Sequence, residues 1–178
     1  RLMNACLETT PGQALAAIAG LPARAAGEPL RQLDFHVAIE TGEDSFIAGG
    51  LAARMPELQR WVEDSGGRAT LLRVEVASHT PYMQPAVGPF RHLLERQHFV
   101  VSPIPVLSGI SAEALYRADQ AIEHLSRQLS ETIRWKDCMD AFVESGVTVA
   151  LELGPGAALA RMLQARHPQI ACRSVADF

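Results

Sequence analysis

Residues 13–76 read QALAAIAGLPARAAGEPLRQLDFHVAIETGEDSFIAGGLAARMPELQRWVEDSGGRATLLRVEV. This stretch predicts six short elements in the order strand, helix, strand, strand, helix, strand, because apolar runs and amphipathic stripes alternate along it between turn residues. The turn over residues 40–44 is of the kind that joins two strands of a hairpin. The expected strands cover residues 13–19, 35–39, 45–48 and 72–76, and the expected helices cover residues 22–32 and 51–65.

The second of these helices carries the clearest pattern. Leu51, Met55, Leu58 and Val62 fall on one stripe, and Gly66–Gly67 ends it. The last strand alternates apolar and polar residues, as a half-buried strand does. The order of the six elements is that of the ferredoxin-like split motif, and about 65 residues are enough for such a motif to close as a unit.

From residue 77 onward the pattern changes to strand–helix repeats, which build a sheet with helices on its faces. A helix ends near Gln97 and is expected to kink or start late at Pro89, which lacks an N–H donor. Asp119 is expected to cap the next helix. Further strands are predicted over residues 104–107 and 147–153, and further helices over residues 135–143 and 157–166.

The predicted division has three parts. Residues 1–10 form the tail of a helix of a larger subdomain, residues 11–76 form an inserted ferredoxin-like small subdomain, and residues 77–178 form the carboxy-terminal part of the large α/β subdomain. The sequence starts without Met, as a trimmed or internal segment would, and no targeting signal can be recognised in it.

The composition excludes several classes of function. The 178 residues include 16 basic and 20 acidic side chains and 6% aromatic residues, which argues against a nucleic-acid partner. No apolar stretch approaches the roughly 20 residues that a membrane span needs. Cys6, Cys138 and Cys172 are odd in number and far apart, which predicts buried free thiols in a reducing cytoplasm rather than disulfides or a metal site.

His79 is the first candidate for chemistry, because it directly follows a predicted strand, where α/β proteins place reactive groups. A histidine held in a turn by hydrogen bonds is the alternative interpretation. A histidine base needs a nucleophile, and the G-x-S-x-G elbow that supplies a reactive serine does not occur in the chain. Ser111 has only the first half of that context and is interpreted as a loop or capping residue.

The turn Gly154–Gly156 could face an anion but lacks the rest of a dinucleotide fingerprint, so a tight turn is the better interpretation.

Three segments together resemble the malonyl-CoA:acyl carrier protein transacylases in order and approximate spacing. They are Val74–Ala86, which contains Ser-His-Thr-Pro; Arg127-Gln128-Leu129 followed by Arg134-Trp135; and Leu151-Glu152-Leu153-Gly154-Pro155-Gly156 followed by Leu159. Arg1-Leu2-Met3 is also similar to the end of a short helix of that family. The sequence Ser-His-Thr-Pro and the final segment, residues 173–178, look most like the malonate decarboxylase branch of the family, and in particular its epsilon subunit.

This resemblance implies an α/β fold, namely part of an α/β-hydrolase-like acyltransferase core with an inserted ferredoxin-like (βαββαβ) subdomain. It also implies that malonyl passes from malonyl-CoA to a serine and then to the thiol of an acyl carrier protein. His79 would be the general base, and the backbone carbonyl of Gln128 would orient its ring. Met3 would line the acyl pocket, and Arg1 would neighbour the arginine that pairs with the malonyl carboxylate.

The resemblance covers only the carboxy-terminal portion of the family, because the serine elbow and the oxyanion loop have no counterpart here. By itself this chain is therefore expected to be inactive. The family implies no metal and no redox cofactor, and other malonate decarboxylase subunits are candidate partners. Two alternatives stay open: a transacylase of fatty-acid or polyketide synthesis, and a non-catalytic module that docks a carrier protein or a decarboxylase subunit.

Overall fold

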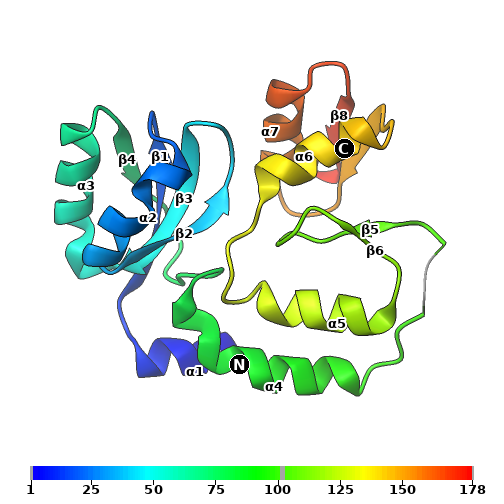
Figure 1. Ribbon diagram of the computed structural model, residues 1–178, viewed down its shortest axis with the longest axis horizontal. Helices are drawn as coiled ribbons and strands as arrows, with labels where there is room; N and C mark the ends of the chain where they lie inside the picture. Colours follow the sequence, from blue (N-terminus) through cyan, green and yellow to red (C-terminus); the bar gives the residue numbers. More distant parts are fainter. Residues whose placement is uncertain (1, 101–102, 178) are drawn as a thin grey trace.

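The computed structural model describes residues 2–100 and 103–177, except for the side chain of Met3. Figure 1 shows a sheet with its helices at one side, a smaller α/β unit at the other, and further helices along the bottom of the view. The sheet has four strands, and the helices along the bottom are α1 (Leu2–Thr9), α4 (Gln84–Glu95) and α5 (Ala118–Arg127). No helix in the described ranges is long and apolar enough to cross a membrane.

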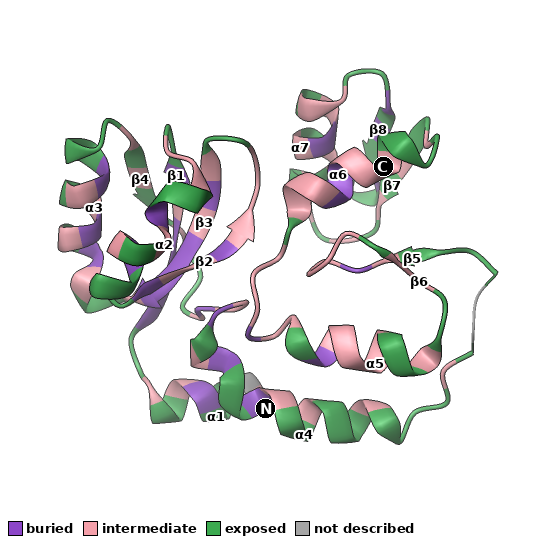
Figure 2. Cartoon of the chain, viewed as in Figure 1, coloured by how far each residue is buried: buried purple, intermediate pink, exposed green. Residues whose placement is uncertain are grey.

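The four-stranded sheet has the strand order of the split motif. Its strands are β1 (Gln13–Ala19), β2 (Phe35–Glu40), β3 (Ser45–Leu51) and β4 (Arg68–Leu71). They lie in the order β2-β3-β1-β4, and every neighbouring pair is antiparallel. Two helices, α2 (Ala23–Gln32) and α3 (Met55–Asp64), pack on it, and the shared core between them is buried (Figure 2).

The second helix starts later than its stripe predicts. Residues 49–51 continue strand β3, since β1 is long enough to pair with all of them, with Leu51 opposite Gln13. A 3-10 turn over Ala52–Arg54 follows, and α3 begins at Met55. Pairing across the sheet therefore overrides the helical pattern at Leu51.

The prediction of a last strand over residues 72–76 is wrong. The last strand of this sheet, β4, lies earlier in the chain and ends at Leu71. The N–H of Leu72 still donates to the carbonyl of Leu15 at 2.8 Å, and the chain then leaves the sheet. No described strand pairs with residues 73–76, and the side chain of Val74 is exposed. The alternation of residues 72–76 thus lies just beyond the edge strand.

An expected late start and an expected cap in the lower helices are also wrong. Helix α4 begins at Gln84 and includes Pro89 as its sixth residue, so Pro89 does not delay its start, and the N–H that Pro89 lacks would bond only one carbonyl of the first turn. Helix α5 is preceded by Arg117, with no side-chain cap, and Asp119 lies inside the first turn, where it forms an ion pair with Arg117. An acidic side chain in the first turn still suits the helix dipole.

The smaller α/β unit contains α6 (Trp135–Glu144), β7 (Val149–Glu152), α7 (Ala158–Arg166) and β8 (Ala171–Ser174). Strands β7 and β8 are parallel, and Met139, Leu163 and Ile170 form the buried core beside them. The strand predicted over residues 104–107 is reduced to β5 (Val106–Leu107), which pairs with β6 (Ala114–Leu115). Strands β6 and β8 were not predicted. The three cysteines are buried and free, as predicted.

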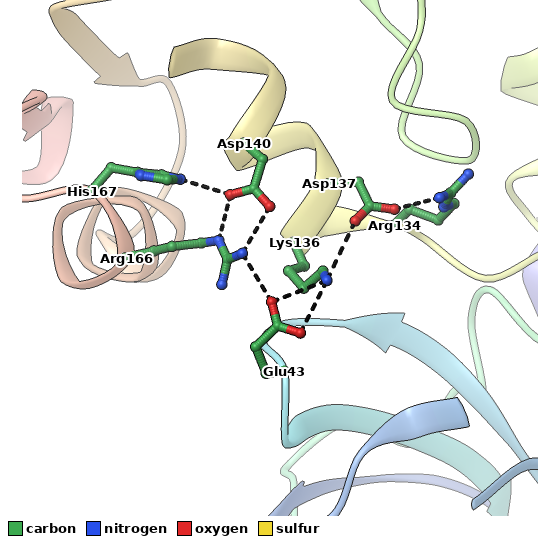
Figure 3. A network of polar contacts seen from close by, with 7 residues as sticks. All are labelled: Glu43, Arg134, Lys136, Asp137, Asp140, Arg166 and His167. Atoms are coloured by element: carbon green, nitrogen blue, oxygen red, sulfur yellow. Dashed lines mark hydrogen bonds and ion pairs between the residues drawn. The ribbon is translucent and has the colours of Figure 1, made fainter. Parts of the chain in front are cut away.

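A polar network joins the tip of the β2–β3 hairpin to the smaller unit (Figure 3). Glu43 on the hairpin accepts hydrogen bonds from Lys136 at 3.1 Å and from Arg166 at 3.2 Å. Arg166 also forms a two-pronged ion pair with Asp140, at 2.6 and 2.7 Å, and His167 lies 2.8 Å from the same carboxylate. The network also includes Arg134 and Asp137. These contacts fix the hairpin relative to α6 and α7.

Candidate functional site

The loop that carries His79 is held from below by buried polar groups. Gln13, which is 2% exposed, accepts a hydrogen bond of 2.9 Å from the N–H of Ala77. The hydroxyl of Thr80, also fully buried, donates to the carbonyl of Ala77 at 2.6 Å. His79 lies between Ala77 and Thr80 in the chain. Its φ is positive, at 62°, which is a left-handed backbone conformation that few non-glycine residues adopt. The surrounding bonds therefore force a specific backbone geometry on the histidine.

The structure brings His79 and Gln128 together. Nδ1 of the imidazole lies 2.5 Å from the carbonyl oxygen of Gln128, and the N–H of His79 donates to the carbonyl of Leu129 at 2.9 Å. A carbonyl only accepts, so Nδ1 carries the proton and Nε2 is left as the acceptor. Gln128 is the C-cap of α5, where the negative end of the helix dipole favours a donor. A neutral imidazole in this tautomer can take a proton through Nε2.

His79 opens onto a cavity of about 530 Å³ between the sheet and the segment that follows α5. Half-buried His79 therefore combines a fixed ring with access from outside. The described residues that line the cavity are Gly27, Arg31, His36, Val37, Glu40, His79, Pro81, Ile110, Ser130, Glu131, Thr132 and Arg134.

A second histidine of the cavity wall was not identified from the sequence. His36 lies on β2 and meets the ring of Tyr82 edge-on, at 5.9 Å between ring centres. Burial lowers the pKa of His36, and the nearby positive charge of Arg31 lowers it further, so this ring is neutral at pH 7. The alternation along β2, with Phe35 buried and His36 on the other face, is the signal that could have pointed to it.

The charges around the cavity are paired with one exception. Arg31 pairs with Glu28, Arg134 with Asp137 and Glu131 with Arg127, at 2.5 to 2.8 Å. The carboxylate of Glu40 forms no ion pair with any side chain in the described part of the chain. The wall beside His79 therefore carries one uncompensated negative charge.

Residues 128–134, here called the strap, connect His79 to the edge of the sheet. At one end the strap supplies the two carbonyls that hold His79. At the other end it runs beside β2, with Ile133 in a parallel bridge to Ile39. The N–H of Arg134 also donates to the carbonyl of Gly109 at 2.7 Å. The strap thus covers the outer edge of β2, which would otherwise be open.

The structure does not describe the side chains of the two predicted substrate-binding residues, Arg1 and Met3. Arg1 lies outside the described residues, and Met3 belongs to α1 but its side chain is not described. Both assignments stay predictions. The neighbouring part of α1 packs through Cys6 onto Met83, in the turn that follows His79.

A serine–histidine pair elsewhere was also missed. The hydroxyl of Ser108 lies 2.7 Å from Nδ1 of His124, but Ser108 is only 4% exposed and does not line the cavity. Its oxygen also accepts a hydrogen bond from the N–H of Ile110. A hydroxyl that is buried and bonded on both sides is structural rather than nucleophilic.

The Gly154–Gly156 turn is structural too. The carboxylate of Glu152 already accepts a hydrogen bond of 2.8 Å from the N–H of Ala160 in the first turn of α7, so a negative group fills the place of an external anion. Ser174 donates to the carbonyl of Gly156 from β8. Within the described residues there is also no group of three or more His, Cys, Asp or Glu side chains that could hold a metal ion.

Comparison of the sequence with curated proteins finds relatives named as malonyl CoA-acyl carrier protein transacylases and as polyketide synthases. No family model matches the sequence. The malonyl CoA-acyl carrier protein transacylase of Haemophilus influenzae is 32% identical over 113 residues, which are 64% of this chain and 36% of that protein. The transacylase of Bacillus subtilis is 26% identical over 115 residues, again 36% of its length. Polyketide synthase GfsA of Streptomyces halstedii is 29% identical over 138 residues, 2% of its length.

Comparison with solved structures identifies the same fold. The crystal structure of FabD from Acinetobacter baumannii superposes with a TM-score of 0.87 and 24% identity, covering 98% of this chain and 57% of that one. A malonyl-transacylase solved with the acyl-carrier protein of a type II polyketide synthase gives a TM-score of 0.88, 22% identity and 59% coverage of its chain. The chain thus spans less than two thirds of the proteins that it matches. Its mixed α/β fold is that of FabD-type acyltransferases, as predicted.

Proposed function

We propose that this chain supplies the histidine part of a malonyl transfer site, in which malonyl passes from coenzyme A to the thiol of a carrier protein. The observation that carries the proposal is the 2.5 Å contact between Nδ1 of His79 and the Gln128 carbonyl at the wall of an open cavity. The contact fixes one tautomer and leaves Nε2 free to accept a proton. The relatives named as malonyl transacylases support the choice of acyl group.

In the proposed reaction, Nε2 of His79 takes the proton of a serine hydroxyl while the oxygen attacks the thioester carbonyl of malonyl-CoA. The C–S bond breaks, and the imidazolium returns the proton to the leaving thiolate, which gives free coenzyme A and a malonyl ester. In the second half the carrier thiol loses its proton to Nε2 and attacks the ester. The C–O bond breaks, and the serine oxygen regains the proton. The scheme needs no metal and no redox cofactor.

The serine is proposed to come from a polypeptide segment other than these 178 residues, because the G-x-S-x-G motif is absent from them. Arg1 and Met3 are proposed to lie beside the malonyl group. Residues 11–76 are proposed to form the small subdomain and residues 77–178 part of the large one, so that the cavity lies between the two.

The metabolic setting is a finer proposal. Ser78-His79-Thr80-Pro81 and the ending of residues 173–178 favour malonate decarboxylation, with other decarboxylase subunits as partners. The relatives support fatty-acid or polyketide synthesis equally well, because they include transacylases of unspecified pathway and polyketide synthases. The carrier protein that accepts the malonyl group distinguishes these settings.

The test uses the native protein that contains this chain, incubated with malonyl-CoA and either a malonate decarboxylase carrier or a fatty-acid-type carrier, each with its thiol arm attached. Mass spectrometry of the carrier then measures malonyl transfer. Faster loading of one carrier assigns the setting. A complex with a carrier that forms without any transfer would identify a docking module instead and would contradict the proposed activity.

A further inference from the structure

The strap and strand β2 meet in a seam of three hydrogen bonds. The N–H of Ile133 donates to the carbonyl of Ala38 at 2.8 Å, and the N–H of Glu40 donates to the carbonyl of Ile133 at 2.8 Å. The hydroxyl of Thr132 donates to the carbonyl of Val37 at 2.7 Å. The seam lies where the pairing of β2 with β3 is irregular, between Val37 and Ile39. At this point β2 is therefore held in place by hydrogen bonds to the strap as well as by its pairing with β3.

The same strap holds the catalytic ring only a few residues away. Leu129 and Gln128 bind His79 through their carbonyls, three and four residues before Thr132. A compact turn links the two ends, because the N–H groups of Ser130 and Glu131 both donate to the carbonyl of Arg127 at 3.0 Å. With such a turn between them, a shift at the seam is transmitted to the carbonyls that hold His79.

Thr132 is the one member of the seam that depends on a side chain. The other two bonds join backbone groups, which any residue except proline can supply. A β-branched side chain has few rotamers, so the hydroxyl of Thr132 is held in the direction of Val37. Thr132 also lines the cavity together with His79 and Val37.

We propose that Thr132 is a positioning residue for His79: its hydroxyl holds the strap against β2, and the strap in turn aims the Gln128 carbonyl at Nδ1. Thr132 acts through the backbone and contacts no reacting atom. Without the hydroxyl, the strap keeps two of its three bonds to β2, and the Gln128 carbonyl loses its fixed distance from the ring. The ring then samples both tautomers, and the form with a free Nε2 acceptor becomes less populated.

The first test needs no enzymatic activity. Nitrogen-15 NMR of the histidine ring reports directly which nitrogen of His79 carries the proton, and it is measured on the full chain with Thr132→Val, Thr132→Ala and Thr132→Ser. The expected result is a single Nδ1–H tautomer in the unchanged chain and in Thr132→Ser, and a mixture of tautomers in both other variants. Two variants without the hydroxyl are used so that a folding defect of one does not decide the outcome.

The matched control is Thr41→Val. Thr41 also forms a side-chain hydrogen bond, to Ser45 at 3.1 Å, but this bond stays within the hairpin. Thr41 follows Glu40 of the seam, yet among the described residues its side chain forms no hydrogen bond to the strap. Its removal is expected to leave the His79 signals unchanged. The proposal is overturned when Thr132→Val and Thr132→Ala retain the tautomer of the unchanged chain, or when Thr41→Val disturbs it as much as they do.

The second test rests on the proposed function and uses malonyl transfer by the native protein. Thr132→Val is expected to lower kcat about 3- to 10-fold, the effect of one lost hydrogen bond, with KM nearly unchanged and with recovery in Thr132→Ser. A KM effect alone would contradict a positioning role. Absence of transfer in the unchanged protein would refute the proposed function, whereas the tautomer measurement would still decide the role of Thr132.

Discussion

The carbonyl oxygen of Gln128 lies 2.5 Å from Nδ1 of His79, although the two residues are 49 positions apart in the chain. The acceptor is the backbone of Gln128, not its side chain. Gln128→Ala should therefore keep malonyl transfer within about 3-fold of the unchanged protein, because the carbonyl and its place at the end of α5 are retained. Steady-state transfer assays measure this, and a loss of about 10²-fold, as for a missing general base, would show that the side-chain amide matters instead.

The uncompensated charge of Glu40 predicts an effect on the choice of acyl group. Glu40→Gln should raise kcat/KM for malonyl-CoA several-fold relative to acetyl-CoA, because the carboxylate at the cavity wall repels the malonyl carboxylate. The change should shrink at high salt, which screens charges in an open cavity. Glu63→Gln, at an exposed position of α3, is the matched control. Equal malonyl-to-acetyl ratios in Glu40→Gln and the control would rule out a role of this charge.

Gly49 leaves room for the loop that carries His79. A Cβ at this position would lie 2.8 Å from Cγ2 of Thr80 and 3.2 Å from the Cβ of Ala77. Gly49→Ala is therefore expected to destabilise the chain by about 1–3 kcal/mol, the usual cost of overpacking.

Gly88 in α4 offers the comparison, because a Cβ added there would meet no atom of the described residues within 4 Å and the helix itself favours alanine. Denaturant unfolding of both variants measures the difference. The steric account predicts a lower free energy of unfolding for Gly49→Ala than for Gly88→Ala, and the reverse order would contradict it.

The ion pair between Asp140 and Arg166 predicts a pH dependence of stability. Arg166, and after it His167, lowers the pKa of Asp140 below its ordinary value of 3.8. A carboxyl whose pKa is lower in the folded state stabilises the fold at pH values above its unfolded pKa, and this contribution is lost as the pH falls through the folded pKa. Arg166→Gln should thus flatten the fall in the free energy of unfolding between about pH 5 and pH 2.

Arg161→Gln is the control for this measurement, since Arg161 is exposed on the same helix and forms no ion pair within the described residues. Denaturant unfolding across the pH range gives both curves. A slope in Arg166→Gln as steep as in the control would mean that the partly exposed pair contributes no measurable stability, as is common for surface ion pairs.

The sequence was sufficient to predict the first strands and both helices of the sheet, because their core faces follow the helical and strand periods closely. It was insufficient where partners decide the structure. The strand–helix boundary near Leu51 depends on the length of β1, and the short strands β6 and β8 depend on neighbours that periodicity does not reveal.

The candidate site shows the same division. The resemblance named His79 and Gln128, and the structure places them in contact. Thr132 faces the same cavity as His36 and Glu40 only because the strap and strand β2 lie side by side, and it is separated from these two residues by more than 90 positions in the sequence. No local pattern marks such a pairing, so the place of Thr132 at the cavity could be found only in the folded chain.

The most direct measurement is the rate of malonyl transfer from malonyl-CoA to its carrier in the native protein with His79→Ala, beside His92→Ala at an exposed position of α4. We expect a loss of about 10²-fold or more for His79→Ala, as for the removal of a general base, and an unchanged rate for His92→Ala. Transfer by His79→Ala at the rate of His92→Ala would show that His79 is not the base.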